Sequence, residues 1–248
     1  MRIHHVITGT GPVILLTHGF GASSHMFATT VTDLALDHTA ITWDMRGHGR
    51  SDSPSDGDDY SVAASLDDMR AMLDEAGAAQ AVLLGHSLGG YLSLELALAD
   101  PSRVAALVLV DTGPGYRSDR GRQAWNEMAE RYATDLETRG LDGLPGSDEL
   151  RASVHAGPHG LIHAARGMLR QADGHVIDGL ASISASTLVV VGAKDEPFLA
   201  GSHYMAGKIP RARLVVIDGA GHAPPVSHPK TFNAELRRFL TDVAADQP

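Results

Sequence analysis

The sequence predicts an α/β protein with a doubly wound, mostly parallel sheet, and two observations point to that fold class. Short runs of almost wholly apolar residues recur along the chain, and turn residues and then a helical pattern follow each of them. Continuous apolar runs are typical of parallel strands, because helices cover both faces of such a sheet. The alternation of strands and helices predicts the doubly wound architecture.

Six apolar runs are expected to form the parallel strands, and a more polar segment at residues 2–8 is expected to form an edge strand. The runs are residues 13–17, 40–43, 81–84, 105–110, 187–191 and 213–217. The helices expected between them are residues 24–36, 61–76, 88–98, 199–208 and 230–243.

One connection is far longer than the others. The 76 residues 111–186 separate two expected strands and include helical stretches divided by Gly and Pro. A structureless loop of that length is uncommon in a compact domain. The helical stretches are residues 122–138, 148–154 and 161–171. We therefore expect a core of residues 1–112 and 182–248, and a helical cap of residues 113–181 inserted after the sixth strand.

Composition limits the classes of function. The formal net charge is -10, from 20 basic and 30 acidic residues, so nucleic acid and anionic membranes are not expected partners. The chain has no cysteine, which excludes disulfides and thiol catalysis. The first residues lack the apolar stretch of a signal peptide, and no run approaches the roughly 18 apolar residues of a membrane span. We expect a cytoplasmic protein, and its oligomeric state stays open.

The segment G-H-S-L-G-G at residues 85–90 predicts a nucleophile. Ser87 stands between an expected strand and an expected helix, at a turn with almost no loop. A sharp turn of this kind exposes the serine hydroxyl and tolerates only small neighbours, which Gly85 and Gly89 supply. The pattern alone also fits a glycine-rich turn with a capping serine. Its position in a parallel-sheet pattern favours the nucleophile.

Two further residues complete a Ser-acid-His order along the chain. Asp195 follows one expected strand and His222 follows the next, so both lie at the carboxyl edge of the sheet. We expect Ser87 to be the nucleophile, His222 the general base and acid, and Asp195 the carboxylate that orients the imidazole. Asp111, at the end of another strand, is the alternative acid.

An oxyanion hole needs donors where negative charge develops on the substrate. The backbone amide of Leu88 follows the nucleophile and is one expected donor. The amide of Phe20 is the other, because Gly19 and Gly21 let it turn inward. A simple glycine turn is the alternative, but it would leave an aromatic residue exposed.

With these stretches assembled, the chain resembles enzymes of the α/β-hydrolase fold over nearly its whole length. The motifs are H-G-F-G (18–21), D-M-R-G-H-G-R-S-D (44–52), G-H-S-L-G-G (85–90), G-A-K-D-E-P (192–197) and G-A-G-H (219–222). The resemblance implies that the second motif, with His48 and Ser51, is structural. It also implies a small, capped, cofactor-free serine hydrolase similar to esterases, enol-lactonases and cofactor-free haloperoxidases.

The favoured function is hydrolysis of a small carboxylic ester or lactone through an acyl-enzyme. One alternative is cleavage of a C–C bond, or a lyase reaction, on a diketone or enolate; another is a low-turnover ligand receptor of this fold. His86, Trp125 and Tyr132 are candidate substrate contacts, although packing of a cap helix also explains the last two.

Three histidines in the expected cap, spaced four apart, could suggest a metal site. They are His155, His159 and His163. The intervening Gly157, Pro158 and Gly160 interrupt the helix that would align them, and no carboxylate lies among them. We therefore expect no metal here, and the resemblance described above implies that no cofactor is needed.

Overall fold

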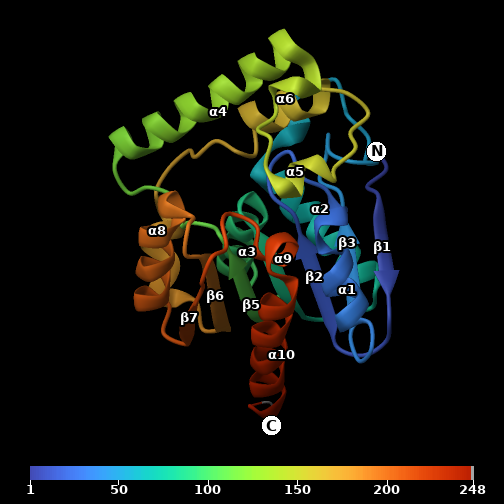
Figure 1. The fold of residues 1–248 in the computed structure, drawn as a ribbon, viewed down its shortest axis with the longest axis vertical. Helices are drawn as coiled ribbons and strands as arrows, with labels where there is room; N and C mark the ends of the chain where they lie inside the picture. Colours follow the sequence, from blue (N-terminus) through green and yellow to red (C-terminus); the bar gives the residue numbers. More distant parts are fainter. Residues whose placement is uncertain (247–248) are drawn as a thin grey trace.

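The computed structural model describes residues 1–246, in which seven strands form one sheet (Figure 1). The strands are β1 (His5–Thr8), β2 (Val13–Thr17), β3 (Thr39–Trp43), β4 (Ala81–His86), β5 (Val104–Val110), β6 (Ser186–Gly192) and β7 (Ala212–Ile217). Their order across the sheet is β1-β3-β2-β4-β5-β6-β7. The edge strand β1 is antiparallel to β3, and every other pair is parallel. The predicted fold class is therefore confirmed.

Helices connect most of the strands. They are α1 (Ala28–Leu34), α2 (Val62–Glu75), α3 (Leu88–Ala99), α4 (Asp119–Arg139), α5 (Asp148–Arg151), α6 (His159–Arg166), α7 (His175–Gly179), α8 (Glu196–Lys208), α9 (Pro224–Ser227) and α10 (Pro229–Ala245). Short 3-10 helices are η1 (Ser24–Phe27), η2 (Gly57–Tyr60), η3 (Pro101–Arg103), η4 (Gly140–Gly143) and η5 (Leu180–Ser182). The sequence did not predict α7 and α9, because a single turn is too short to show helical periodicity.

Several expected helices differ from the observed ones. The helix expected over residues 148–154 ends at Arg151, and the one expected over residues 122–138 begins at Asp119. The helix expected over residues 24–36 is divided into η1 and α1, because Phe27 leaves the helical region with φ -96° and ψ 7°. The helix expected over residues 161–171 ends at Arg166, where Gly167 follows as its C-cap. Helix α8 begins three residues earlier than expected, with Asp195 as its N-cap and Pro197 in its first turn.

The position of the long connection also needs one correction. Counted along the chain, β5 is the fifth strand, so the helical segment α4–α7 follows the fifth strand and not the sixth. The segment at residues 2–8 and the four apolar runs up to residue 110 already make five expected strands, so the number six was a miscount. Residues 247 and 248, which end the expected core, lie outside the described residues.

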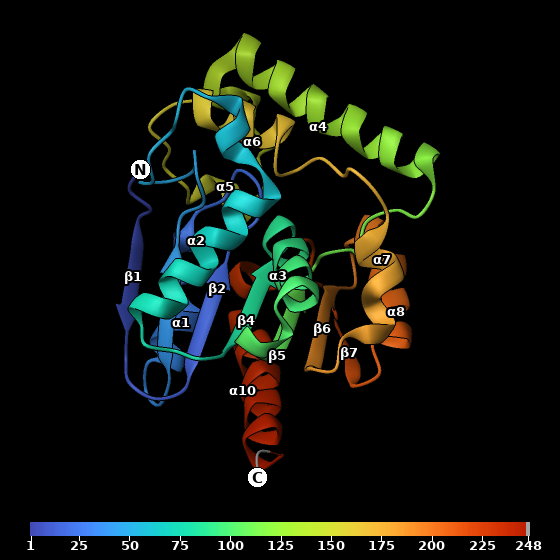
Figure 2. The same ribbon diagram turned by 180° about the vertical axis from the view of Figure 1, so that it is seen from behind.

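Side chains of the central strands alternate between two layers of helices. Leu15 packs in the cluster that includes residues of α2 and α3, whereas its neighbours Ile14 and Leu16 pack with residues of α1 and α10. Figures 1 and 2 show these helix pairs on opposite faces of the sheet. Burial on both faces explains why the strands are apolar at nearly every position.

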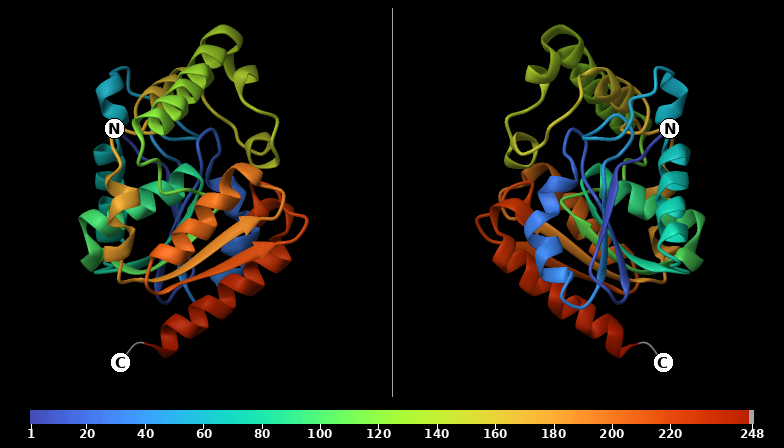
Figure 3. Two further views of the ribbon diagram at one scale, coloured as in Figure 1. Left: turned by 90° about the vertical axis from the view of Figure 1, so that its left-hand side faces the viewer. Right: turned by 90° about the vertical axis from the view of Figure 1, so that its right-hand side faces the viewer.

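The segment between β5 and β6 lies beyond the carboxyl edge of the sheet. Figure 3 shows α4 at this end of the molecule, while the C-terminal end of α10 lies at the other. Within the described residues, no helix has the length and apolar character needed to cross a bilayer.

The motif at residues 44–52 holds the loop after β3 together. The carboxylate of Asp44 accepts hydrogen bonds from the amides of Ser24 and Arg50, at 2.8 and 2.9 Å. The buried Ser51 hydroxyl donates to the Asp44 carbonyl at 2.5 Å and accepts from the His4 amide at 2.8 Å. Because its hydroxyl both donates and accepts a hydrogen bond within the protein, Ser51 is structural.

Candidate active site

The turn predicted at Ser87 is present and leaves the residue in an unusual conformation. Ser87 has φ 50° and ψ -117° and lies directly between β4 and α3. A Cβ atom on Gly85 would lie 2.2 Å from the Gly89 carbonyl oxygen, and one on Gly89 would lie 2.2 Å from the Thr17 carbonyl oxygen. Only glycine therefore fits on either side of the serine, and the turn holds the hydroxyl at the carboxyl edge of the sheet.

Two loops from neighbouring strands bring the predicted acid and base together. Asp195 follows β6, His222 follows β7, and the His222 Nδ1 atom lies 2.8 Å from the Asp195 Oδ2 atom. The Asp195 side chain is only 6% exposed, whereas that of His222 is 30% exposed. A bond from Nδ1–H to the carboxylate leaves Nε2 as the basic nitrogen.

Ser87 and His222 line the same cavity, which has a volume of about 750 Å³. Most of its lining side chains are apolar or aromatic, as in sites for small organic ligands. Residues of α3, α4, α5 and α8 contribute to its wall.

The two expected oxyanion donors also border this cavity. Within the described residues, neither the Phe20 amide nor the Leu88 amide makes a hydrogen bond to the protein. Gly21, with φ 73°, turns the chain just after Phe20. Two unpaired amides near a partly exposed serine can stabilise an oxyanion.

The alternative acid, Asp111, lies close to the same pair. Single side-chain atoms of Asp111, Asp195 and His222 lie within 4.8 Å of one another. Asp111 is fully buried, and its Oδ1 atom accepts a hydrogen bond from the Gly192 amide at 2.9 Å. It is Asp195, however, that bonds to the imidazole.

His86 faces the cavity, but its hydrogen bond goes to the protein. Its Nε2 lies 2.7 Å from the His222 carbonyl oxygen, so Nε2–H donates to the loop that carries the histidine. Burial, followed by the neighbouring His222, holds the pKa of His86 well below the usual range. A neutral His86 thus supports the position of His222.

The two aromatic candidates on α4 both face the cavity and pack against the core. The Tyr132 ring stacks on Phe20 with centroids 5.8 Å apart, and the Trp125 indole donates to the Leu169 carbonyl at 2.7 Å. Packing and cavity lining, which the sequence presented as alternatives, are combined in these two residues.

Most side chains of the cavity wall were not predicted from the sequence, and three of them are named here. Phe198 lies 4.8 Å from His222 between ring centroids, and Arg131 and Glu149 line the wall as well. Phe198 could have been found from its position three residues after Asp195, at the start of a helix. Arg131 and Glu149 gave no signal, because isolated charges on helices are usually solvated.

The histidines of the inserted segment are not gathered at one point. His155 accepts from the Gly49 amide and donates to the Gly21 carbonyl, both at 2.9 Å. His159 and His163 pair with each other at 4.5 Å between ring centroids. His155 therefore links the inserted segment to two loops of the sheet.

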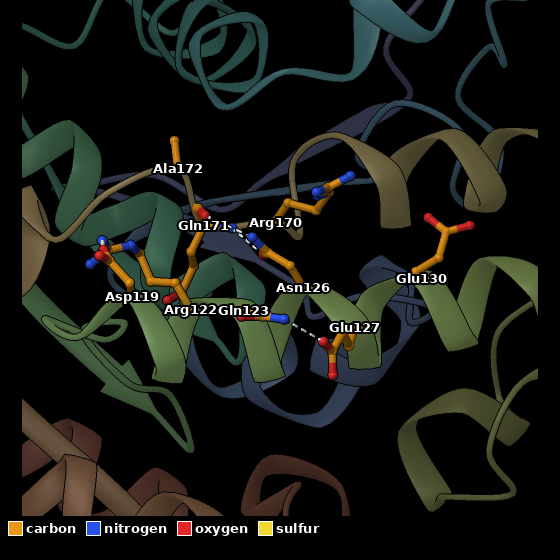
Figure 4. A pocket seen from close by; sticks show the side chains of 9 residues that line it. All are labelled: Asp119, Arg122, Gln123, Asn126, Glu127, Glu130, Arg170, Gln171 and Ala172. Atoms are coloured by element: carbon orange, nitrogen blue, oxygen red, sulfur yellow. Dashed lines mark hydrogen bonds and ion pairs between the residues drawn. The ribbon is translucent and has the colours of Figure 1, made fainter.

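A second depression, of about 500 Å³, lies along α4 (Figure 4). Its polar side chains bond mainly to one another and to nearby backbone, as in the pairs Gln123–Glu127 and Asn126–Gln171. The residues that line it are Asp119, Arg122, Gln123, Asn126, Glu127, Glu130, Arg170, Gln171 and Ala172. It contains no serine and no histidine, so the chemistry is expected in the first cavity.

A serine on a strained strand–helix turn, followed by an acid and a histidine on successive loops, defines the class of the protein as an α/β hydrolase. The family model for the alpha/beta hydrolase fold matches residues 12–147, more than half of the chain. The chain belongs to this family, and it is an enzyme of the hydrolase type.

Individual relatives match over nearly the whole chain. A pimeloyl-[acyl-carrier protein] methyl ester esterase of Aliivibrio fischeri is 26% identical, covering 95% of this chain and 96% of the relative. A hydrolase from Pseudomonas aeruginosa has a TM-score of 0.81 at 27% identity, covering 96% and 94%. A thermophilic esterase from Thermogutta terrifontis has a TM-score of 0.82 at 28% identity, covering 97% and 93%.

Proposed function

We propose that the protein is a serine hydrolase that cleaves a carboxylic ester or lactone of a small organic molecule through an acyl-enzyme. The observation that carries this proposal is the 2.8 Å contact between Asp195 and His222, beside a cavity that Ser87 also lines. Two of the relatives described above are named esterases, which is consistent with the proposed reaction.

In the first half of the reaction, the Ser87 Oγ attacks the substrate carbonyl carbon. The Nε2 atom of His222 accepts the hydroxyl proton and then gives it to the leaving alcohol oxygen, as the C–O bond breaks. The amides of Phe20 and Leu88 donate to the oxyanion. Asp195 stays ionised and stabilises the imidazolium that forms on His222.

In the second half, water releases the acyl group. His222 removes a proton from a water molecule, whose oxygen attacks the carbonyl carbon of the acyl-enzyme. The tetrahedral intermediate collapses, the bond to Ser87 breaks, and the proton on Nε2 returns to the serine oxygen. For a lactone the leaving alcohol stays attached to the acid, so the product is one hydroxy acid.

The helical segment of residues 113–181 acts as a cap that limits which substrates fit. Trp125 and Tyr132 border the cavity from α4, and residues of loops at the sheet edge border it too. An apolar, aromatic wall favours an uncharged acyl group, because each apolar group that enters it leaves water.

A fluorophosphonate probe followed by peptide mass mapping tests the proposal. We expect labelling on the peptide that contains Ser87, and none on the peptide that contains Ser51. The label should disappear in Ser87→Ala and should form far more slowly in His222→Gln. Labelling that persists in Ser87→Ala would overturn the assignment of the nucleophile.

A substrate screen separates the proposal from its alternatives. Turnover of simple p-nitrophenyl esters and lactones supports ester hydrolysis. Turnover of vinylogous diketones without turnover of esters would replace it with C–C bond cleavage. Saturable binding of a small ligand, with a large thermal shift but negligible turnover, would replace it with a receptor.

A further inference from the structure

A second buried carboxyl group lies behind the proposed triad and has no part in the mechanism above. Asp111 directly follows β5, and its amide donates to the Val190 carbonyl of the neighbouring β6 at 2.9 Å. Its side chain has no solvent exposure. Among the described non-glycine residues, only Ser87 and Asp111 have positive φ, at 50° and 44°. Such backbone strain is concentrated at functional sites.

The hydrogen bonds of Asp111 are incomplete if its carboxyl group is ionised. Oδ1 accepts from the Gly192 amide at 2.9 Å. Oδ2 is buried and, within the described residues, has no N–H or hydroxyl donor. An unsatisfied buried oxygen of an ionised carboxylate is costly.

The carboxylate of Asp195 also has few hydrogen-bond donors among the described residues. It receives the imidazole N–H of His222, and among residues 1–246 no backbone amide donates to it. An ionised carboxylate has about four acceptor sites on its two oxygens, so one hydrogen bond leaves most of them unused. The two carboxyl groups are close, because one atom of each and one of His222 lie within 4.8 Å of one another. One proton on Asp111 Oδ2 would satisfy both groups.

The charges around Asp111 favour that proton. The ionisable groups that act on it are Asp195 and Glu149, both acidic, and it has no Lys or Arg partner among the described ion pairs. His222 is the nearby base, but its N–H is engaged by Asp195. Two carboxyl groups that share one buried site do not both ionise. Burial, and then the closeness of Asp195, raise the pKa of Asp111 to about 10.

We propose that Asp111 is a neutral carboxylic acid at neutral pH and donates an Oδ2–H hydrogen bond to the carboxylate of Asp195. Asp111 is then a positioning residue: it fixes the rotation of the Asp195 carboxylate so that Oδ2 of Asp195 points at His222. Its protonation follows from burial and contacts alone, whereas its effect on turnover rests on the proposed function.

Infrared difference spectroscopy tests the protonation without any substrate. The spectrum of the native enzyme minus that of Asp111→Asn, at pH 7, should contain the C=O band of a protonated carboxyl group. The band should shift when the protein is transferred to D₂O. If the band is absent, the proposal is wrong, even if the enzyme has esterase activity. If the band is present, Asp111 is protonated, even if the substrate class proposed above is wrong.

Two variants test the positioning role. Asparagine keeps a neutral donor and tolerates positive φ, so Asp111→Asn should retain kcat/KM within roughly threefold. Glycine also tolerates positive φ but has no donor, so Asp111→Gly should lose roughly 10- to 100-fold in kcat/KM, the effect of losing a hydrogen bond to a charged group. Circular dichroism and thermal unfolding verify that both variants fold.

The pH profile separates positioning from a direct role. Asp111→Asn removes no charge if Asp111 is neutral, so the acidic limb of kcat/KM should not move. If Asp111 is ionised, its neutralisation should shift that limb toward acid by roughly one unit. Such a shift, a loss near 10⁴-fold in Asp111→Asn, or full activity in Asp111→Gly would each overturn the positioning role.

Discussion

The His222 Nδ1 atom lies 2.8 Å from the Asp195 Oδ2 atom, although the two residues belong to different strand–loop units. Their strands are neighbours, and Gly192 of β6 pairs with Ile217 of β7. A Cβ atom on Gly192 would lie 2.1 Å from the Gly221 carbonyl oxygen, so only glycine lets the two loops approach. The contact between Asp195 and His222 thus depends on the glycine at position 192 as well as on the two side chains themselves.

Replacement of Ser87 by alanine should abolish turnover of p-nitrophenyl acetate, because no other described hydroxyl lies on this strand–helix turn in the wall of the cavity. A steady-state assay with purified protein measures this. Ser51→Ala is the matched control, because Ser51 also lies in a glycine-containing motif, at residues 44–52. It should keep kcat near the native value but lower the free energy of unfolding by about 1–2 kcal/mol, because it loses two buried hydrogen bonds. Native turnover in Ser87→Ala would refute the proposed mechanism.

Asp195→Asn should reduce kcat by roughly 10⁴-fold, because an amide no longer holds the imidazole in the required tautomer. The neighbouring Glu196→Gln, in the first turn of α8, provides the control and should leave kcat nearly unchanged. Rates for both variants can be compared with the same ester. A small effect at Asp195 together with a large one at Asp111 would exchange the two roles.

Gly89→Ala should lower the free energy of unfolding by about 3 kcal/mol or more, since the new methyl group would lie 2.2 Å from the backbone oxygen of Thr17. Gly207→Ala in α8 is the opposite case, because nothing lies within 4 Å of the added Cβ. That variant should gain about 0.5–1 kcal/mol from helix propensity. Urea unfolding compares the two, and similar effects of both substitutions would contradict the steric account of the turn.

The stability of the protein should fall as the pH drops below 6.5, and His18 contributes to this dependence. Its Nδ1–H donates to the Gly19 carbonyl and its Nε2 accepts from the Met45 amide, so the buried ring is neutral. Burial lowers the pKa of His18 from 6.5 to about 4. Between these values the unfolded chain binds a proton that the folded protein does not, so stability present above pH 6.5 is lost toward pH 4.

Urea unfolding at several pH values measures the slope. For His18 it should be on the order of 1 kcal/mol per pH unit within the window. His18→Gln should be less stable at pH 7, but its stability should depend less steeply on pH. An unchanged slope in the variant would assign the dependence to other buried histidines, such as His48 and His86.

Tyr132→Ala should raise KM for bulky aryl esters by roughly tenfold and have a smaller effect on acetate esters, because it removes a stacked ring from the cavity wall. Tyr132→Phe keeps the ring and should behave like the native enzyme. Equal effects of the alanine variant on large and small esters would show that Tyr132 only stabilises the fold.

Much of the fold was predictable from local patterns. The apolar run at residues 13–17 forms β2 with the expected bounds. Helices cover both faces of this strand, so apolar residues occupy nearly all of it and mark where it begins and ends. The helix expected over residues 61–76 appears as Val62–Glu75, and the Ser61 hydroxyl caps it by accepting from the Ala64 amide at 3.1 Å. Short helices such as α9 were not predicted, because four residues, two of them proline, are too few to show helical periodicity.

The sequence by itself determined the order of strands and helices and the glycine-bounded turn at Ser87, because each depends on residues adjacent in the chain. It also limited the acid to a few positions at strand ends. Only the tertiary structure shows which of them contacts the imidazole: the distance from His222 to Asp195, and the burial of Asp111 near that pair, depend on how neighbouring strands are placed in the sheet. The tertiary structure likewise gave His86 and Tyr132 their partners, since those contacts join segments far apart in the chain.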